Sequence, residues 1–269
     1  MKKITALLLS IALLTIFGYF MHKAYKDAKE LERINKSYYE AQSDIEELIK
    51  RKFSSLLESL TFGMVEADKK SIDLDRLKAQ QIVLKEENQK DIYYLFAIVA
   101  AMGALYFLDI KLFTLTIAIA SLISLIYGVI TPILMIVIHK EVSFLGDVIL
   151  SYESKTILST ISHLYSNKNY PVALVILLFS IIVPLIKTTI MIVASISSNF
   201  NLNQKILEFL KHLGKWSMID VFVVALLLVY FSVGSSQNSY SQIQNGLYMF
   251  LIYVILSLIT SIFIDRVRK

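Results

Sequence analysis

Residues 213–231 read LGKWSMIDVFVVALLLVYF. The segment is almost wholly apolar and about as long as a helix that crosses a bilayer, which needs roughly 20 such residues. Asp220 lies a few residues inside the apolar run, where a charge costs roughly 2.5–3.5 kcal/mol on insertion scales. Lys215 and Trp216, the one tryptophan of the chain, precede it and are residue types that suit a membrane interface. The segment therefore predicts a membrane helix whose buried carboxylate is explained either by a partner side chain or by a functional role.

The composition of the whole chain points the same way. Of its 269 residues 56% are hydrophobic and 18% charged, and the mean hydropathy is +0.61, which is typical of an integral membrane protein. Cysteine is absent, which excludes disulfides and thiolate zinc sites. The net charge of +5 is modest and not clustered in one basic patch. It is therefore interpreted as lysines and arginines on the cytoplasmic face of the membrane, and no nucleic-acid partner is expected.

Six apolar segments predict an all-α membrane protein with six transmembrane helices. They are residues 4–20, Ile92–Leu108, Leu112–Ile138, Val172–Ser195, Met218–Val233 and Leu247–Ile264. The first follows Lys2 and Lys3 and lacks a small-residue cleavage site, so it favours an uncleaved anchor over a signal peptide. Basic residues in the short loops place both termini in the cytoplasm.

Residues 21–91 are strongly polar and predict a helical hairpin outside the membrane. Apolar residues at 3-4 spacing from Leu31 to Leu48 indicate one arm, and a second arm is expected from about Ser71 to Asp91. A turn is expected near Thr61–Gly63. Two interpretations stay open: a spacer that pairs with itself, or a rod that docks a partner or a second copy through residues 31–60.

Two loops contain smaller amphipathic segments. In the outer loop, apolar residues from Ile157 to Tyr165 predict a helix with Ser154 as N-cap, preceded by a short strand over Val142–Leu150. In the cytoplasmic loop, Ile206–Leu213 predicts a helix at the inner membrane surface.

Polar residues of three membrane helices fall at similar depth in the cytoplasmic half of the bilayer. Lys187 lies roughly 14 Å from the inner end of its helix and Asp220 roughly 6 Å inside its own, by the rise of an α-helix. A lysine and an aspartate at overlapping depth can pair or exchange a proton. The other members of this predicted polar centre are Ser217 and Thr260, and Pro184 is expected to kink the helix one turn before Lys187.

Each of these residues also has a purely structural interpretation. Lys187 could extend its ammonium to the interface, and Asp220 could favour the positive end of its helix. Ser217 could cap a helix, and Thr260 could bond to its own backbone. Scattered histidines and the lack of a phosphate-binding loop give no enzyme motif, so we expect neither catalysis nor a bound cofactor or metal.

The segment from Gly214 through Trp216 and Met218 to Leu227 resembles the most characteristic motif of the paraquat-inducible protein A family. The helix with Pro184 and Lys187 resembles the span that precedes that motif in the family, and the order of loops and helices agrees over about residues 112–265. The resemblance implies a four-helix module in the inner membrane of bacteria with two membranes. It also implies a periplasmic partner with mammalian-cell-entry (MCE) domains, and phospholipid as cargo.

By the same resemblance, Lys187, Ser217, Asp220 and Thr260 would couple a proton or ion gradient to lipid movement. Two features depart from the family: the chain has no cysteine pairs for zinc ribbons, and it has one copy of the module where many members have two. We therefore expect that two chains together replace the tandem copies.

These observations predict four parts and a localisation. The parts are an anchor over 1–20, a periplasmic coiled hairpin over 21–91, a second membrane helix over 92–110 and a four-helix module over 111–269. The predicted function is that of an inner-membrane component of intermembrane lipid transport. The alternative is a transmembrane sensor or assembly scaffold that uses the hairpin.

Overall fold

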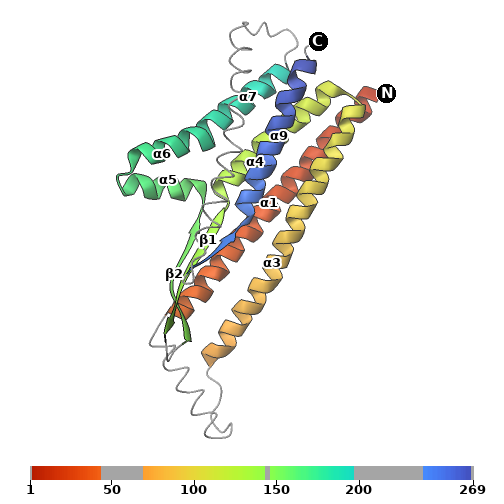
Figure 1. Ribbon diagram of the computed structural model, residues 1–269. Helices are drawn as coiled ribbons and strands as arrows, with labels where there is room; N and C mark the ends of the chain where they lie inside the picture. The colour runs from red at the N-terminus through yellow and green to blue at the C-terminus, as the bar shows by residue number, and fades with distance from the viewer. Residues whose placement is uncertain (1, 44–68, 143–145, 197–238, 268–269) are drawn as a thin grey trace.

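The computed structural model describes residues 2–43, 69–142, 146–196 and 239–267. Five of the described helices are long and apolar enough to cross a membrane. This confirms a helical multi-pass membrane protein, and the predicted sixth helix over Met218–Val233 lies outside the described residues. Both termini lie at the same end of the molecule (Figure 1).

The N-terminal anchor and the first hairpin arm form one unbroken helix, α1 (Lys2–Ser43). It packs along α3 (Lys69–Met102), which continues into the short 3-10 helix η1 (Gly103–Phe107). The buried residues of α1 recur mostly at steps of three and four, which places them on one stripe of the helix. They are Ala6, Ser10, Phe17, Met21, Ala24, Ala28, Leu31, Ile34 and, next to it, Asn35. The predicted turn near Thr61–Gly63 and most of the predicted 31–60 repeat lie outside the described residues.

The helix α4 (Ile110–Ile130) is shorter than predicted. Asp109 caps its start by accepting from the backbone N–H of Lys111, at 2.8 Å. The predicted span Leu112–Ile138 is wrong at its outer end, because Pro132 disfavours helical backbone at the preceding residue, Thr131. Beyond that proline the chain is extended as β1 (Leu134–Val142).

Three strands form a small antiparallel sheet in the order β2-β1-β3. The outer strands are β2 (Gly146–Lys155) and β3 (Ser239–Ile243), and Leu134 of β1 pairs with both Lys155 and Ile243. The strand predicted over Val142–Leu150 is therefore displaced, and the sequence analysis did not predict β1 or β3. Tyr152 of β2 stacks on Tyr39 of α1 at 5.0 Å between ring centroids, which fastens the sheet to the hairpin.

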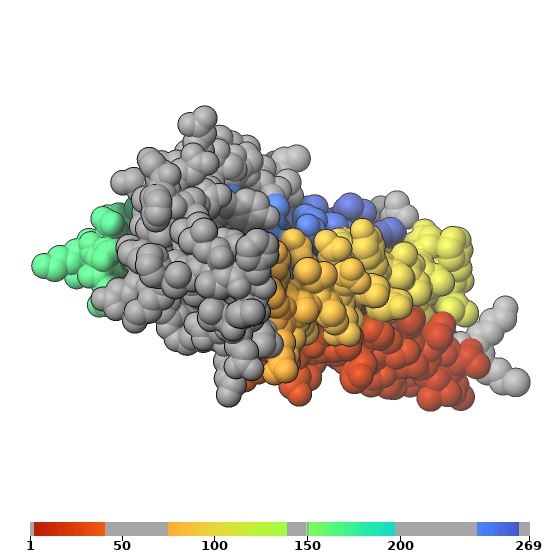
Figure 2. Space-filling view, turned by 90° about the horizontal axis from the view of Figure 1, so that it is seen from below, coloured from red at the N-terminus to blue at the C-terminus, as the bar shows by residue number. Residues whose placement is uncertain are grey.

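After the sheet, the chain turns sideways into α5 (Ile157–Ser166) and returns in α6 (Tyr170–Leu177). This pair projects from one side of the molecule, opposite the side formed by α1 and α3 (Figures 1 and 2). The predicted helix is confirmed, but its N-cap is Thr156 and not Ser154, because Ser154 is still paired in the sheet with Met135.

The predicted span Val172–Ser195 is a single membrane-crossing helix in three parts. The helix α6 continues into a π-helical turn, η2 (Leu178–Ile182), and then into α7 (Val183–Ile196). The last helix, α9 (Asn245–Val267), packs on α4, and these two helices form the centre of the molecule (Figure 1). Around them α1 and α3 cover one side and α7 another.

Candidate functional site

Like Asp91 of α3, Lys187 of α7 is a charged residue buried within the described membrane helices. Its side chain is 1% exposed, and its helix α7 packs against α4 and α9. A lysine that extends its ammonium to the interface would leave the charged end exposed, so this burial disfavours the snorkelling interpretation. Enclosed charges in membrane helices are rare and mark functional sites by default.

The π-helical turn lies directly before Pro184. Proline has no N–H, so it cannot hydrogen-bond to the preceding turn, and a helix often adjusts there by a π segment. Within α7, Thr188 Oγ1 donates to Pro184 O at 2.7 Å, the bond that a helical threonine makes to the carbonyl one turn earlier. The predicted kink at Pro184 stays a prediction, and the structure shows a local change of helix type just before it.

Thr260 is buried in α9, and its hydroxyl is already satisfied. Thr260 Oγ1 donates to Leu256 O at 2.8 Å, which is the self-bonding arrangement expected for its structural interpretation. The remaining predicted site residues lie outside the described residues, so the pairing of Lys187 with Asp220 stays a prediction. These residues are Lys215, Trp216, Ser217, Met218 and Asp220.

The sequence analysis missed a group of buried hydroxyls on α4 and α9, the helices that pack against α7. Ser124 Oγ of α4 donates across to Met249 O of α9 at 2.7 Å. The hydroxyls of Ser121 in α4 and Ser257 in α9 are buried without a hydrogen-bond partner among the described residues. Small residues at steps of four, Ala120, Ser124 and Gly128, could have indicated this close contact between helices.

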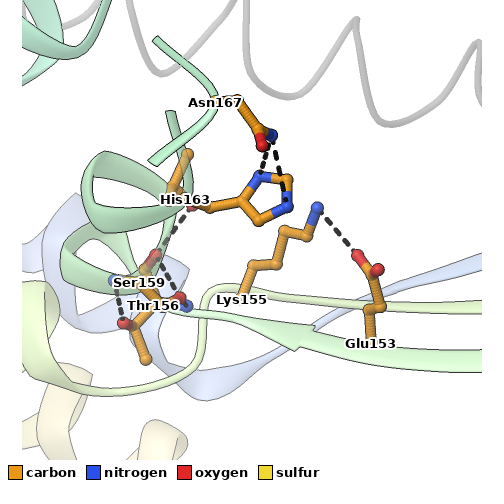
Figure 3. A network of polar contacts seen from close by, with 7 residues as sticks. Glu153, Lys155, Thr156, Ser159, His163 and Asn167 are labelled. Atoms are coloured by element: carbon orange, nitrogen blue, oxygen red, sulfur yellow. Dashed lines mark hydrogen bonds and ion pairs between the residues drawn. The ribbon is translucent and has the colours of Figure 1, made fainter. Parts of the chain in front are cut away.

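A polar cavity of about 680 Å³ lies outside the membrane helices, between α1, β2 and α5. Its charged side chains are Lys29, Glu32, Arg33, Lys36, Glu40, Glu153 and Lys155. Figure 3 shows one wall, where Lys155 Nζ lies 2.8 Å from Glu153 Oε2 beside the reciprocal Thr156–Ser159 cap and His163. The hydrogen bond from Lys155 lowers the pKa of the Glu153 carboxyl, whereas burial raises the pKa of Tyr152. Because cations and carboxylates alternate here, the cavity is nearly neutral.

Polar pairs fasten the hairpin to the rest of the molecule where it leaves the apolar segments. Lys23 Nζ of α1 lies 2.7 Å from Asp91 Oδ1 of α3, whose side chain is almost fully buried. Further out, Asn35 of α1 accepts from Gln81 Nε2 of α3 at 2.5 Å and donates to Met135 Sδ of β1. The hairpin is therefore bound to the sheet by side chains that a free spacer would not need.

Comparison with known proteins identifies the family of the chain. The family described as paraquat-inducible protein A matches residues 113–268, which is more than half of the chain. The chain belongs to the paraquat-inducible protein A family. The match begins at α4 and ends at the last helix, so α1 and α3 lie before the part shared with the family.

The curated relatives of this family member are intermembrane transport proteins. The protein PqiA of Escherichia coli (strain K12), so described, is 33% identical over 130 residues, which is 44% of this chain and 30% of that protein. The proteins of the same name from Escherichia coli O6:H1 and Shigella flexneri show the same identity and coverage. The chain thus spans about a third of the length of these relatives. No solved structure matches the chain.

Proposed function

We propose that the chain is an inner-membrane component of intermembrane lipid transport. Membership of the paraquat-inducible protein A family, with relatives described as intermembrane transport proteins, is the observation that carries this proposal. With both termini in the cytoplasm, the sheet, the α5–α6 pair and the outer part of the hairpin lie on the periplasmic side. A periplasmic MCE-domain protein is the partner that this arrangement would face, and a phospholipid is the cargo.

Within this proposal, Lys187 and Asp220 form a charge pair whose protonation differs between two conformations. The burial of Lys187 on α7, a helix that packs against α4 and α9, supports it, because a charge sealed in protein needs a counter-charge or an exchangeable proton. The π-helical turn before Pro184 gives α7 a place where its helix can change register. The work done is transport and not a chemical reaction, so the proposed protein is not an enzyme and uses no cofactor.

Two variants test the coupling. We expect Asp220→Asn and Lys187→Gln to leave the protein folded and able to bind its partner, and to reduce lipid transfer at least about tenfold, since each removes the exchangeable charge. The measurement is transfer of labelled phospholipid from inner-membrane vesicles to the purified partner. Lys168→Gln is the matched control, because Lys168 is exposed at the end of α5. Undiminished transfer by both variants would make the pair structural.

Partner and cargo are tested by affinity purification of the chain in a mild detergent. We expect mass spectrometry to find an MCE-domain protein and enriched phospholipid in the eluate. Neither of them, together with self-association of the chain, would contradict the transport proposal. Light scattering of the same sample would show one chain or two per micelle.

A sensor or scaffold is the second candidate, because α1 and α3 run without a break from the membrane into the outer hairpin. Such continuous helices can relay a signal along their length. Replacing residues 44–68 by a short glycine-serine linker distinguishes the two candidates. A transporter keeps its bound lipid after this change, whereas a sensor loses its input.

A further inference from the structure

A second cavity, of about 440 Å³, lies between α3, β3 and α9, away from Lys187 and from the polar cavity beside β2. One wall is α3, which precedes the part shared with the family. The other walls, β3 and α9, belong to that shared part. Among the described residues, the lining of the cavity includes one charged side chain, Lys85 of α3. This part of the lining carries a single positive charge, unlike the mixed charges of the cavity beside β2.

The α3 wall changes from polar to apolar along its length. Lys85, Gln89, Tyr93 and Phe96 follow one another at steps of four, four and three residues, so they share one helix face. Lys85 and Gln89 belong to the polar hairpin, whereas Phe96 belongs to the apolar span that starts at Ile92. Tyr93 lies at the boundary and is 74% exposed, which is the position that tyrosine favours at a membrane interface.

The opposite wall is β3, an edge strand of the sheet among the described residues. Consecutive residues from Ser241 to Asn245 line the cavity, and the first three of them belong to β3. Side chains of a strand alternate between two faces, so three consecutive strand residues on one cavity indicate that β3 presents its edge to it. The described partner of β3 is β1, on its other side. An edge strand offers backbone N–H and C=O groups to whatever lies beside it.

Asn88 supplies the observation that points to a ligand. Its side chain is 3% exposed and lines the cavity, and its Oδ1 accepts from Asn245 Nδ2 at 2.5 Å. Its own Nδ2 has no hydrogen-bond partner among the described residues. A buried donor without an acceptor is costly, and this one lies three residues along α3 from Lys85, the one charged residue of the described lining.

We propose that this cavity binds the phosphate-bearing headgroup of a membrane phospholipid. The phosphate oxygens accept hydrogen bonds from Asn88 Nδ2 and from the side chains of Lys85 and Gln89. The acyl chains pass Tyr93 and continue along Phe96 into the bilayer. A free phosphate ion would use the polar end alone and leave the apolar end of the cavity without a role. The inference rests on the proposed function, since it assigns the place where lipid enters or leaves on the outer side.

Photocrosslinking of the full-length protein tests the site. A benzophenone amino acid replaces Tyr93, and the protein is reconstituted in nanodiscs of phosphatidylglycerol and phosphatidylcholine. Tyr94 is the matched control position: it is adjacent and exposed, but its ring faces Phe20 of α1 at 5.4 Å. We expect a phosphatidylglycerol adduct at position 93 that exceeds the adduct at position 94 about tenfold, because a hydrogen-bonded site holds its ligand longer than a lipid-facing surface. Equal adducts at the two positions would overturn the site.

Charge removal tests the role of Lys85. We expect Lys85→Gln to reduce the adduct at position 93 about tenfold, the effect of losing one hydrogen bond to a charged group. Lys90→Gln removes the same charge from an exposed position of α3 outside the lining and should leave the adduct unchanged. Thermal unfolding of both variants confirms that they remain folded. An unchanged adduct in Lys85→Gln contradicts the proposal.

Two further measurements, competition by phosphate and transfer of lipid, distinguish failure of this site from failure of the proposed function. Excess inorganic phosphate should leave the lipid adduct intact, and complete loss would show a phosphate site in place of a lipid site. Lipid transfer that persists while position 93 gives no specific adduct would retain the proposed function and reject this cavity. A specific adduct without transfer to a partner would retain the cavity and reject the function.

Discussion

At the scale of single residues, the structure depends on a few positions where the backbone tolerates no change. Gly246 is the second residue of α9, and its N–H donates to Pro132 O, just beyond the end of α4, at 2.8 Å. A Cβ atom there would overlap the carbonyl oxygen of Thr131 and lie 2.6 Å from that of Pro132. Because both neighbours are backbone atoms, they cannot move aside without shifting the start of the sheet.

We expect Gly246→Ala to destabilise the protein by about 1–3 kcal/mol, as overpacking does. The measurement is thermal unfolding in detergent micelles. Gly18→Ala is the matched control: no atom lies within 4 Å of its added Cβ, so it should be neutral or stabilise α1 by about 1 kcal/mol. Similar unfolding of the two variants would contradict the close approach at Gly246.

The Glu153–Lys155 pair predicts a small acid sensitivity. The pKa of Glu153 is lowered by the hydrogen bond from Lys155, so the pair's contribution to stability is present above the ordinary glutamate pKa and is lost as the pH falls through the lowered value. The pair is half-exposed, so we expect less than about 0.5 kcal/mol. Unfolding temperatures between pH 7 and pH 3 should fall less in Glu153→Gln than in the unchanged protein, and equal falls would refute the contribution.

At the scale of elements, the contact between α4 and α9 holds the centre of the module. Gly128 lets the Phe250 backbone approach so closely that an added Cβ would lie 2.9 Å from its nitrogen. In lipid, where apolar surface gives helices little reason to associate, such close packing and interhelical hydrogen bonds provide the stability. Ser124, one turn earlier, supplies such a bond to Met249 O.

We expect Ser124→Ala to cost about 1 kcal/mol, because it leaves the Met249 carbonyl without this donor. Ser121→Ala is the matched control on the same helix: its hydroxyl is buried without a hydrogen-bond partner among the described residues, so its removal should be neutral or stabilising. Chemical or thermal unfolding of both variants in the same detergent makes the comparison. A larger loss for Ser121→Ala would show that its hydroxyl has a partner in the functional state.

At the scale of the whole molecule, the hairpin and the membrane module form a connected unit. The stacked Tyr39–Tyr152 pair joins α1 to the sheet, and the Asn88–Asn245 pair joins α3 to α9. The apolar stripe of α1 at Leu31 and Ile34 is already buried within the chain. Over residues 31–43, this burial favours a hairpin that packs within the chain over one that pairs with a second copy. Self-association through the rest of residues 31–60 stays a prediction.

The Lys23–Asp91 pair tests how strongly the two arms are joined. We expect Asp91→Asn to destabilise the protein by about 1–3 kcal/mol, because the carboxylate is buried and makes a charge-assisted hydrogen bond. Glu40→Gln is the control, since it breaks an exposed pair with Lys36 at 3.8 Å and should cost less than about 0.5 kcal/mol. Equal unfolding temperatures for the two variants would show that the buried pair adds nothing.

The sequence by itself determined the membrane class, the positions of most helices and the family resemblance. Apolar length and interfacial residues act locally, so a linear pattern reveals them. The π-helical turn near Pro184 and the self-bonded Thr260 also follow from local backbone chemistry. Pro132 is also a local signal that α4 ends before it. The predicted span nevertheless ran to Ile138, because the apolar residues continue past the proline.

Only the tertiary structure decided the rest. The pairing of β1 with β3 joins residues about a hundred positions apart, and the hydrogen bond from Ser124 to Met249 spans 125 residues, so neither has a local signal. The burial of Lys187 depends on the packing of α7 in the whole molecule, and the second cavity on α3, β3 and α9 together. Such sites arise from contacts between distant segments, because burial and hydrogen bonding depend on every neighbour in space and not on the neighbours in sequence.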